Sequence, residues 1–171
     1  MSLKGNNKEN DYFKLNSLCC DDRLSEVSFD YDSGVKGKFK NLLTGAIDLV
    51  FRRGEVYSIL DWKSDTLNDK FTSYSDPEQL KNRVDSHYSI QRVIYSYSLI
   101  KWLTQYYKLK NVEKNLTESD IFKNHFGGIY YIFVRGCNEG TSNGIYCQTW
   151  ESWEDLEKEF IKIKMECIGG K

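Results

Sequence analysis

The sequence predicts one α/β or α+β domain, built on a mixed central sheet flanked by helices. Of the 171 residues, 40% are hydrophobic and 15% aromatic, and there is one proline, a composition that suits a folded unit with a real core. Segments with a strand-like period of two alternate with segments of helical period, in the order three strands, helix, two strands, helix. Residues 1–10 are polar and patternless, so we expect a disordered leader followed by a single domain over 11–171.

The first three predicted strands contain a hairpin. Residues 25–31, 45–51 and 59–64 each alternate apolar and polar side chains, which indicates strands with one buried face. Arg53-Gly54 can supply a two-residue turn between the second and third. With that turn, Asp48 lies opposite Ile59, and Asp61 is its diagonal neighbour on the same face.

Two helices are predicted next. Asp76-Pro77 is typical of a helix start, with a capping Asp and a Pro in the first position. We expect a break near residues 86–87 and a second helix over 88–108, whose apolar residues recur at helical spacing. Gln91 and Tyr95 are one turn apart on a neighbouring face of that helix, so both can point the same way.

The last third of the chain contains two further strands and a helix. After a polar connection, residues 128–134 form a continuous apolar run, which predicts a strand covered on both faces. Residues 144–149 read as another strand, and residues 153–165 as a closing amphipathic helix.

Charge and cysteine content exclude several classes of protein. The formal net charge of −1 predicts no strongly basic nucleic-acid clamp, so DNA binding would need local patches, a metal or a partner. The five cysteines contain no C-x-x-C pair and are odd in number, which fits reduced thiols rather than a disulfide frame, zinc site or iron–sulfur site. No signal peptide or membrane span is visible, so we expect a cytoplasmic protein with no membrane partner.

Asp48, Asp61 and Lys63 are the candidate catalytic residues. Side chains alternate along a strand, so Asp61 and Lys63 share a face, and the hairpin brings Asp48 to the same edge. Two carboxylates and an ammonium can hold a divalent cation and direct a water at a phosphate. Charged residues also commonly decorate the solvated face of a strand. Here, however, the aspartates are flanked by apolar residues, and a carboxylate in such surroundings usually has a partner or a metal.

These residues carry a family resemblance. Gly45-Ala46-Ile47-Asp48, Asp61-Trp62-Lys63 and Gln91-Arg92-Val93-Ile94-Tyr95 match, in order, the Gly-x-x-Asp, Asp-Tyr-Lys and Gln-x-x-x-Tyr pattern of RecB-type nuclease domains in the PD-(D/E)xK superfamily. The run 125–136, which opens His-Phe-Gly-Gly, resembles the late strand of RecB-type chains. The resemblance spans roughly residues 24–160. It implies a restriction-endonuclease-like core and the C-terminal nuclease domain of a helicase–nuclease, an exodeoxyribonuclease V β subunit acting in double-strand break repair and recombination.

The resemblance also implies roles for the site residues. Asp48 and Asp61 would ligate one or two Mg²⁺ ions, with the backbone carbonyl of Trp62 as a third protein ligand; Mn²⁺ or Ca²⁺ can substitute for binding. Lys63 would orient the attacking water. Gln91 and Tyr95 would support the site or contact the DNA backbone. The implied partners are DNA and, for the full-length protein, RecC-like and RecD-like subunits.

One departure from the pattern matters. RecB-type domains carry a metal-binding His on a helix before the first strand, and no His precedes Asp48 here. We therefore expect the chain to lack that first core helix and to be weakly active alone, with His87 and His125 as scaffold residues. The main alternative is a truncated, catalytically weak domain that serves as a docking module for partner subunits. A stand-alone nuclease of the phage exonuclease kind is disfavoured by the His-Phe-Gly-Gly strand.

Overall fold

The computed structural model describes residues 2–4, 12–32, 42–67, 71–110 and 116–169. Within these ranges it contains strands and α-helices in the order β1 (Ser2–Lys4), β2 (Tyr12–Lys14), β3 (Arg23–Asp32), β4 (Leu42–Arg53), β5 (Val56–Lys63), α1 (Pro77–His87), α2 (Ser89–Leu109), α3 (Glu118–His125), β6 (Phe126–Phe133), β7 (Ile145–Gln148) and α4 (Trp153–Gly169). The predicted α/β class with a mixed sheet is confirmed.

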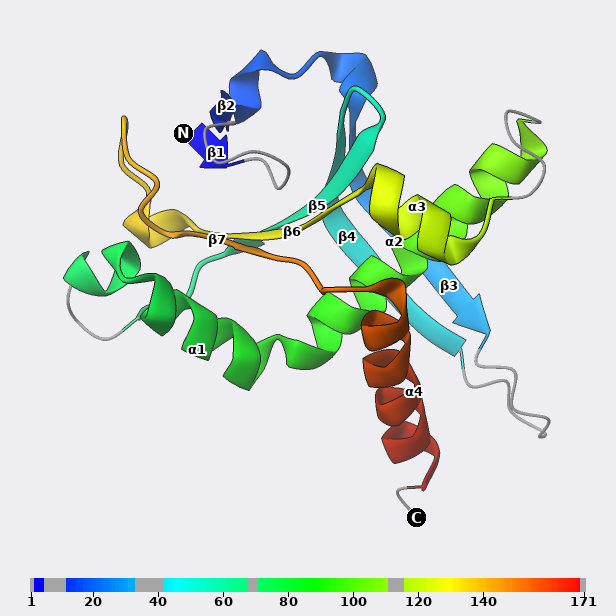
Figure 1. Ribbon diagram of the computed structural model, residues 1–171. Coiled ribbons are helices and arrows are strands. Elements are labelled where there is room, and N and C mark those ends of the chain that lie inside the picture. Colours follow the sequence, from blue (N-terminus) through cyan, green and yellow to red (C-terminus); the bar gives the residue numbers. More distant parts are fainter. Residues whose placement is uncertain (1, 5–11, 33–41, 68–70, 111–115, 170–171) are drawn as a thin grey trace.

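Five of the strands form one sheet, in the order β3-β4-β5-β6-β7 (Figure 1). The β5–β6 pair is parallel and the other neighbours are antiparallel. A parallel pair needs a crossover connection, and α1, α2 and α3 all lie in the chain between β5 and β6. The crossover therefore places α2 against the strands that carry the candidate site residues.

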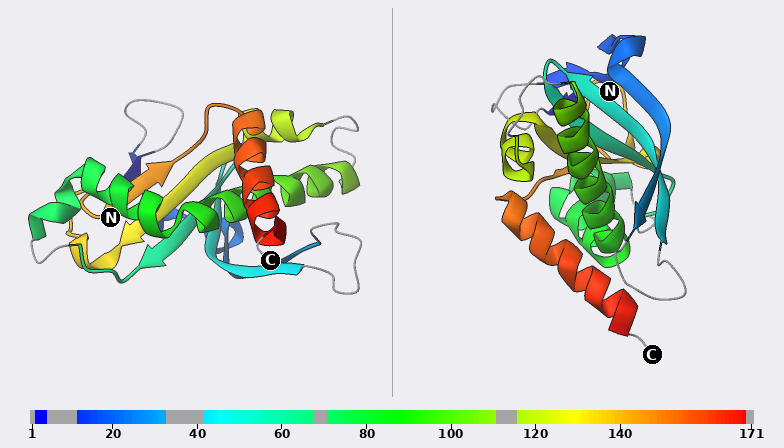
Figure 2. Two further views of the ribbon diagram at one scale, coloured as in Figure 1. Left: turned by 90° about the horizontal axis from the view of Figure 1, so that it is seen from below. Right: turned by 90° about the vertical axis from the view of Figure 1, so that its right-hand side faces the viewer.

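The helices lie on one face of this sheet, and an N-terminal segment lies on the other (Figures 1 and 2). Buried side chains from α1 to α4 pack with Ile59, Tyr131 and Phe133 in the main core. Leu60, Tyr130 and Ile132 point to the opposite face, where Leu15 and Leu18 pack on them. Every residue of β6 is buried, which confirms the prediction of a strand covered on both faces.

Helix α4 packs across α2, as the left view of Figure 2 shows. The ring of Tyr97 in α2 stacks on Trp153, with centroids 5.1 Å apart, and on Phe160, with centroids 3.8 Å apart. These aromatic contacts fix α2 from its outer side. The helix start at Pro77, capped by Asp76, and the break at Tyr88 between α1 and α2 agree with the sequence prediction.

The predicted hairpin turn is wrong by one residue. The turn is Gly54-Glu55, because Arg53 pairs with Val56, and Val50 rather than Asp48 pairs with Ile59. Gly54 has a φ of +59°, which suits a Gly at the first position of a two-residue turn. The paired register ends at Leu49–Leu60, so Asp48 and Asp61 are the next residues along the two strands.

Helix α3 was missed by the sequence analysis, which expected a polar connection there. Thr117 caps it: the Thr117 hydroxyl accepts from the backbone N–H of Asp120, and the Asp120 carboxylate accepts from the backbone N–H of Thr117. This reciprocal pair is a capping box. The helix buries Ile121 and leads directly into β6.

Several other expectations fall partly outside the described residues. Residues 1 and 5–10 of the expected leader lie outside them, whereas residues 2–4 form β1, which pairs with β2. Cys19, Cys20, Cys137 and Cys147 are free thiols, as expected for reduced cysteines; the side chain of Cys167 lies outside the described part. Among the described helices, none is both long and apolar enough to cross a membrane.

Candidate active site

Strands β4 and β5 bring the two candidate carboxylates to one place. Asp48 Oδ2 accepts a hydrogen bond from the backbone N–H of Trp62 at 2.9 Å. The Asp48 side chain therefore reaches across to β5 directly beside Asp61. Asp48 is half-buried, whereas Asp61 is 2% exposed and the Trp62 side chain is 43% exposed.

Asp61, Lys63 and Gln91 form a closed polar triad. The Lys63 ammonium is ion-paired with Asp61 Oδ2. It also donates to Gln91 Oε1 at 2.9 Å, and Gln91 Nε2 donates to Asp61 Oδ1 at 3.1 Å. Gln91 is in the first turn of α2, so the crossover helix contributes a side chain that binds both charged residues of β5. Lys63 is 9% exposed, which is rare for a lysine without a partner.

Burial makes the Asp61 carboxylate bind a proton more readily than an ordinary aspartate does. Loss of solvent raises the pKa of the Asp61 carboxyl above its ordinary value, and the negative charge of Asp48 acts in the same direction. The Lys63 ammonium and the Gln91 amide oppose this rise. Two carboxylates that repel each other in a poorly solvated site favour the arrival of a positive charge.

Tyr95 and Gly45 shape the edge of the site on β4. The Tyr95 hydroxyl donates to the carbonyl of Ala46 at 2.7 Å, two residues before Asp48. The Phe29 and Tyr95 rings meet edge to face, with centroids 5.5 Å apart. A Cβ at residue 45 would stand 2.7 Å from the Phe29 ring, which is closer than real Cβ contacts. The Gly of the Gly-x-x-Asp pattern is thus required by the packing of these two rings.

Two tyrosine rings lie against the ammonium of Lys63. Lys63 Nζ lies 4.0 Å from the centroid of the Tyr88 ring and 5.5 Å from that of the Tyr131 ring. Sequence reasoning did not find either tyrosine, because no local pattern links residue 63 to residue 88. The one available signal was the position of Tyr88, three residues before Gln91 and therefore on a neighbouring part of the same helical face.

The donor set suits a hard divalent cation. Asp48 and Asp61 supply carboxylate oxygens, and Mg²⁺ is commonly held by one or two carboxylates together with waters and substrate phosphate. The described residues contain no group of three or more His, Cys, Asp and Glu side chains that could hold a metal ion. His87 contacts Arg83 and Ser86, and His125 contacts Tyr107 and the Glu55 carbonyl. Both histidines therefore serve local structure, apart from the carboxylates.

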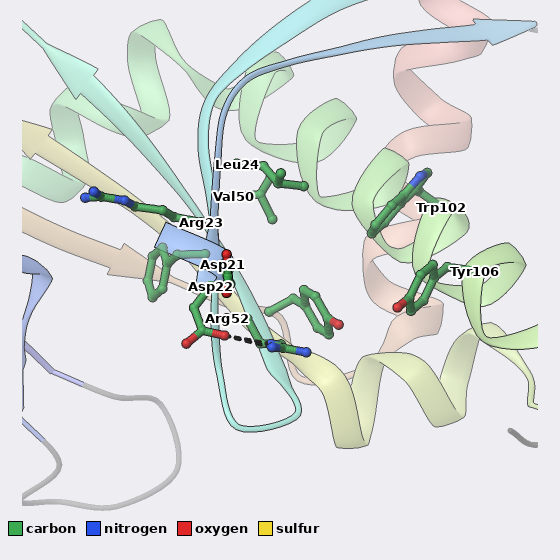
Figure 3. Close-up of a pocket in the computed structure, with 10 residues that line it drawn as sticks. Asp21, Asp22, Arg23, Leu24, Val50, Arg52, Trp102 and Tyr106 are labelled. Carbon is green, nitrogen blue, oxygen red and sulfur yellow. Dashed lines mark hydrogen bonds and ion pairs between the residues drawn. The ribbon is translucent and has the colours of Figure 1, made fainter. Parts of the chain in front are cut away.

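A hollow of about 330 Å³ lies on the same strands, toward the turn of the hairpin. Figure 3 shows Trp102 and Tyr106 of α2 on one side of it, and Leu24 and Val50 on the other. An ion pair between Arg52 and Asp22, 2.8 Å, closes one end. Leu24 is 56% exposed and Trp102 47%, so this hollow presents large apolar side chains to solvent.

Comparison with known proteins identifies relatives of one kind. No protein-family model matches the chain. It is 35% identical over 130 residues to the "RecBCD enzyme subunit RecB" of Buchnera aphidicola subsp. Schizaphis graminum, which covers 72% of this chain and 10% of that protein. It is 31% identical to the Escherichia coli K12 subunit over 63% of this chain and 8% of that protein. It is 27% identical to the Mycolicibacterium smegmatis subunit over 85% of this chain and 14% of that protein.

These matches agree with the resemblance seen in the sequence motifs. The chain spans only about a tenth of the length of the curated relatives it matches. The chain is therefore a relative of one segment of the RecB subunit.

Proposed function

We propose that this chain is a Mg²⁺-dependent DNA phosphodiesterase, the nuclease segment of a RecB-type exodeoxyribonuclease V β subunit with a PD-(D/E)xK core. One observation carries the proposal. Asp48, Asp61 and Lys63 converge at the end of one hairpin, and Gln91 of the crossover helix bonds both Asp61 and Lys63. Sequence similarity to RecB subunits over most of the chain supports the same function.

The proposed roles follow from the contacts. Asp48 and Asp61, with the Trp62 carbonyl, would hold the cation, which when bound lowers the pKa of a coordinated water and screens phosphate charge. Lys63 is a compact point charge suited to a phosphate oxygen or an attacking water. Gln91 orients Asp61 and Lys63 relative to each other, and Tyr95 fixes the backbone before Asp48.

The proposed context is the repair and recombination of double-strand breaks in the cytoplasm. The relatives are named as subunits of the RecBCD enzyme. We extend this to the present protein, with RecC-like and RecD-like subunits and DNA as its partners.

The test is digestion of linear DNA by this chain with and without Mg²⁺. Wild type should release nucleotides or short fragments only with the metal, and Asp61→Ala should abolish the release. Asp30→Ala is the matched control, because Asp30 is an exposed carboxylate of β3. Metal-independent digestion, or equal digestion by wild type and Asp61→Ala, contradicts the proposal.

The second candidate function is a docking module for partner subunits with little catalysis of its own. The apolar hollow beside Leu24 and Trp102 favours it, since exposed apolar patches commonly mark protein contacts. The same digestion assay separates the two: a docking module would give no Mg²⁺-dependent cleavage above the Asp61→Ala background.

A further inference from the structure

Tyr88 occupies the short junction between α1 and α2, and its ring faces the ammonium of Lys63, the candidate catalytic lysine. The Lys63 ammonium lies 4.0 Å from the centroid of its ring. The Tyr131 ring lies alongside, with centroids 5.7 Å apart and an interplanar angle of 22°. The face of an aromatic ring is electron-rich and attracts an ammonium, most strongly where water is excluded. Lys63 is almost fully buried, so this contact is a desolvated one.

The Tyr88 ring is itself held by a charged anchor. Its hydroxyl donates to Asp65 Oδ2 at 2.5 Å, and Arg83 Nε donates to the same oxygen at 2.9 Å. Burial and the Asp65 carboxylate raise the pKa of Tyr88 to about 12, so the phenol keeps its proton and continues to donate. Donation to an anion also polarises the phenol toward its ring, which strengthens the attraction for an ammonium above it.

The Lys63 ammonium has three partners, and under the proposed function one of them, the Asp61 carboxylate, is shared with a cation. The ammonium is paired with Asp61, bonded to Gln91 and seated on the Tyr88 ring. If the Asp61 carboxylate binds a cation, it no longer serves Lys63 alone. A lysine is a point charge on a flexible four-carbon stem, and reacting groups need to be held within about 0.5 Å of their productive position.

We infer that Tyr88 is a positioning residue for this reaction: its ring, anchored by Asp65, holds the Lys63 ammonium at the hairpin when Asp61 is engaged by a cation. The kinetic part of this inference rests on the proposed function. The contact between ring and ammonium does not, and it is measured separately.

The kinetic test compares Tyr88→Phe with Tyr88→Leu. Leucine removes the ring face, and kcat for Mg²⁺-dependent cleavage should fall about 30-fold, the upper range for a desolvated cation–aromatic contact, with KM changed less than about twofold because substrate binding is not involved. Phenylalanine keeps the ring and loses only the anchor, so it should restore kcat to within about fivefold of wild type.

A double-mutant cycle tests the anchor. Asp65→Ala should lower kcat at least as much as Tyr88→Phe, and the pair combined should cost little more than Asp65→Ala alone, because both changes remove the hydrogen bond that anchors the ring. Tyr106→Leu is the matched control: Tyr106 also has a lysine, Lys110, 5.5 Å from the centroid of its ring, but it lies in α2 at the hollow beside Leu24 and Trp102. Its kcat should stay within about twofold of wild type.

The second readout is independent of activity. In protein labelled with ¹³C-lysine, the Lys63 Hε resonances, assigned by their loss in Lys63→Arg, should lie upfield of other lysines because of the Tyr88 ring current. The upfield shift should persist in Tyr88→Phe and shrink markedly in Tyr88→Leu, where only the more distant Tyr131 ring remains. An unchanged shift in Tyr88→Leu, or equal kcat losses in the Phe and Leu variants, overturns the inference. If wild type fails to cleave DNA, the proposed function fails, and the resonance shift still decides whether Tyr88 positions Lys63.

Discussion

Strand β4 and helix α2 together build two very different regions. At one end, Asp61, Lys63 and Gln91 bond one another, and Asp48 accepts a hydrogen bond from the backbone N–H of Trp62 beside them. At the other end, Leu24 and Trp102 border a hollow that presents apolar side chains to solvent. The first region buries charge and the second exposes hydrocarbon, so each departs from the ordinary partition of residues between core and surface.

Under the proposed function, this contrast separates residues that take part in the reaction from residues that contact a partner. A buried ion pair adds little net stability, since its desolvation offsets its attraction. The Asp61–Lys63 pair is therefore poorly explained by folding alone, and the proposed function gives it a role. The exposed apolar side chains add little to folding in the isolated chain, and they suit a surface that another element covers.

The largest expected effect is on catalysis at the first of these regions. Lys63→Ala should lower kcat by about 100- to 1000-fold, the range for losing one charge that stabilises a transition state, and should leave metal binding largely intact. Lys101→Ala is the control, because Lys101 forms a part-buried ion pair with Glu118 far from the hairpin end. A sharp loss of thermal stability in Lys63→Ala, with specific activity per folded molecule unchanged, would make Lys63 a structural residue.

The next effect concerns the free energy of unfolding, and it compares a buried leucine of the core with an exposed leucine of the hollow. Leu60 is fully buried, so Leu60→Ala should reduce the free energy of unfolding by about 2–5 kcal/mol. Leu24 lines the hollow and is half exposed, so Leu24→Ala should change it by no more than about 0.5 kcal/mol. Chemical denaturation of the two variants measures both values. A large loss for Leu24→Ala would mean that the hollow is part of the core.

A smaller effect should appear in the pH dependence of the free energy of unfolding, because the Asp65 carboxyl titrates. Desolvation pushes the pKa of this carboxyl upward, but the hydrogen bonds from Tyr88 and Arg83 outweigh it and hold the pKa below its ordinary value. The stabilisation is present above the unfolded-state pKa of about 3.9 and is lost as the pH falls through the lower folded-state pKa. Asp65→Asn should therefore be less stable than wild type by about 2 kcal/mol at pH 7.

Acid denaturation curves supply the check on Asp65. The stability difference between wild type and Asp65→Asn should shrink as the pH drops below about 3.9. A difference that stays constant from neutral to acid pH would show that the Asp65 carboxylate owes its effect to shape and not to charge.

Local patterns predicted most of the fold, and they predicted that Asp48, Asp61 and Lys63 lie close together, as they do. Alternation gave the strands, and the Asp76-Pro77 start gave α1. The errors were also local: Gly54 takes the positive φ of the turn, so the turn is Gly-Glu rather than Arg-Gly. The Thr117-x-x-Asp120 capping box, a signal present in the sequence, marks α3.

Other features depend on tertiary packing, which local sequence patterns do not specify. The Tyr88 ring meets Lys63 only because the crossover returns α2 to β5. The close approach of Phe29 and Tyr95 that requires Gly45 joins β3, β4 and α2. The roles assigned to Asp48, Asp61, Lys63, Gln91, Tyr95 and the Trp62 carbonyl remain predictions.

The most direct test of the central claim is calorimetric titration of this chain with Mn²⁺ or Ca²⁺, in wild type and in Asp48→Ala, Asp61→Ala and the double variant. Two carboxylates that share one ion should each be needed. We predict that either single change weakens binding strongly and that the double change adds little to the worse single variant. Equal binding by wild type and the double variant would contradict the account, because the two aspartates would then not form a metal site.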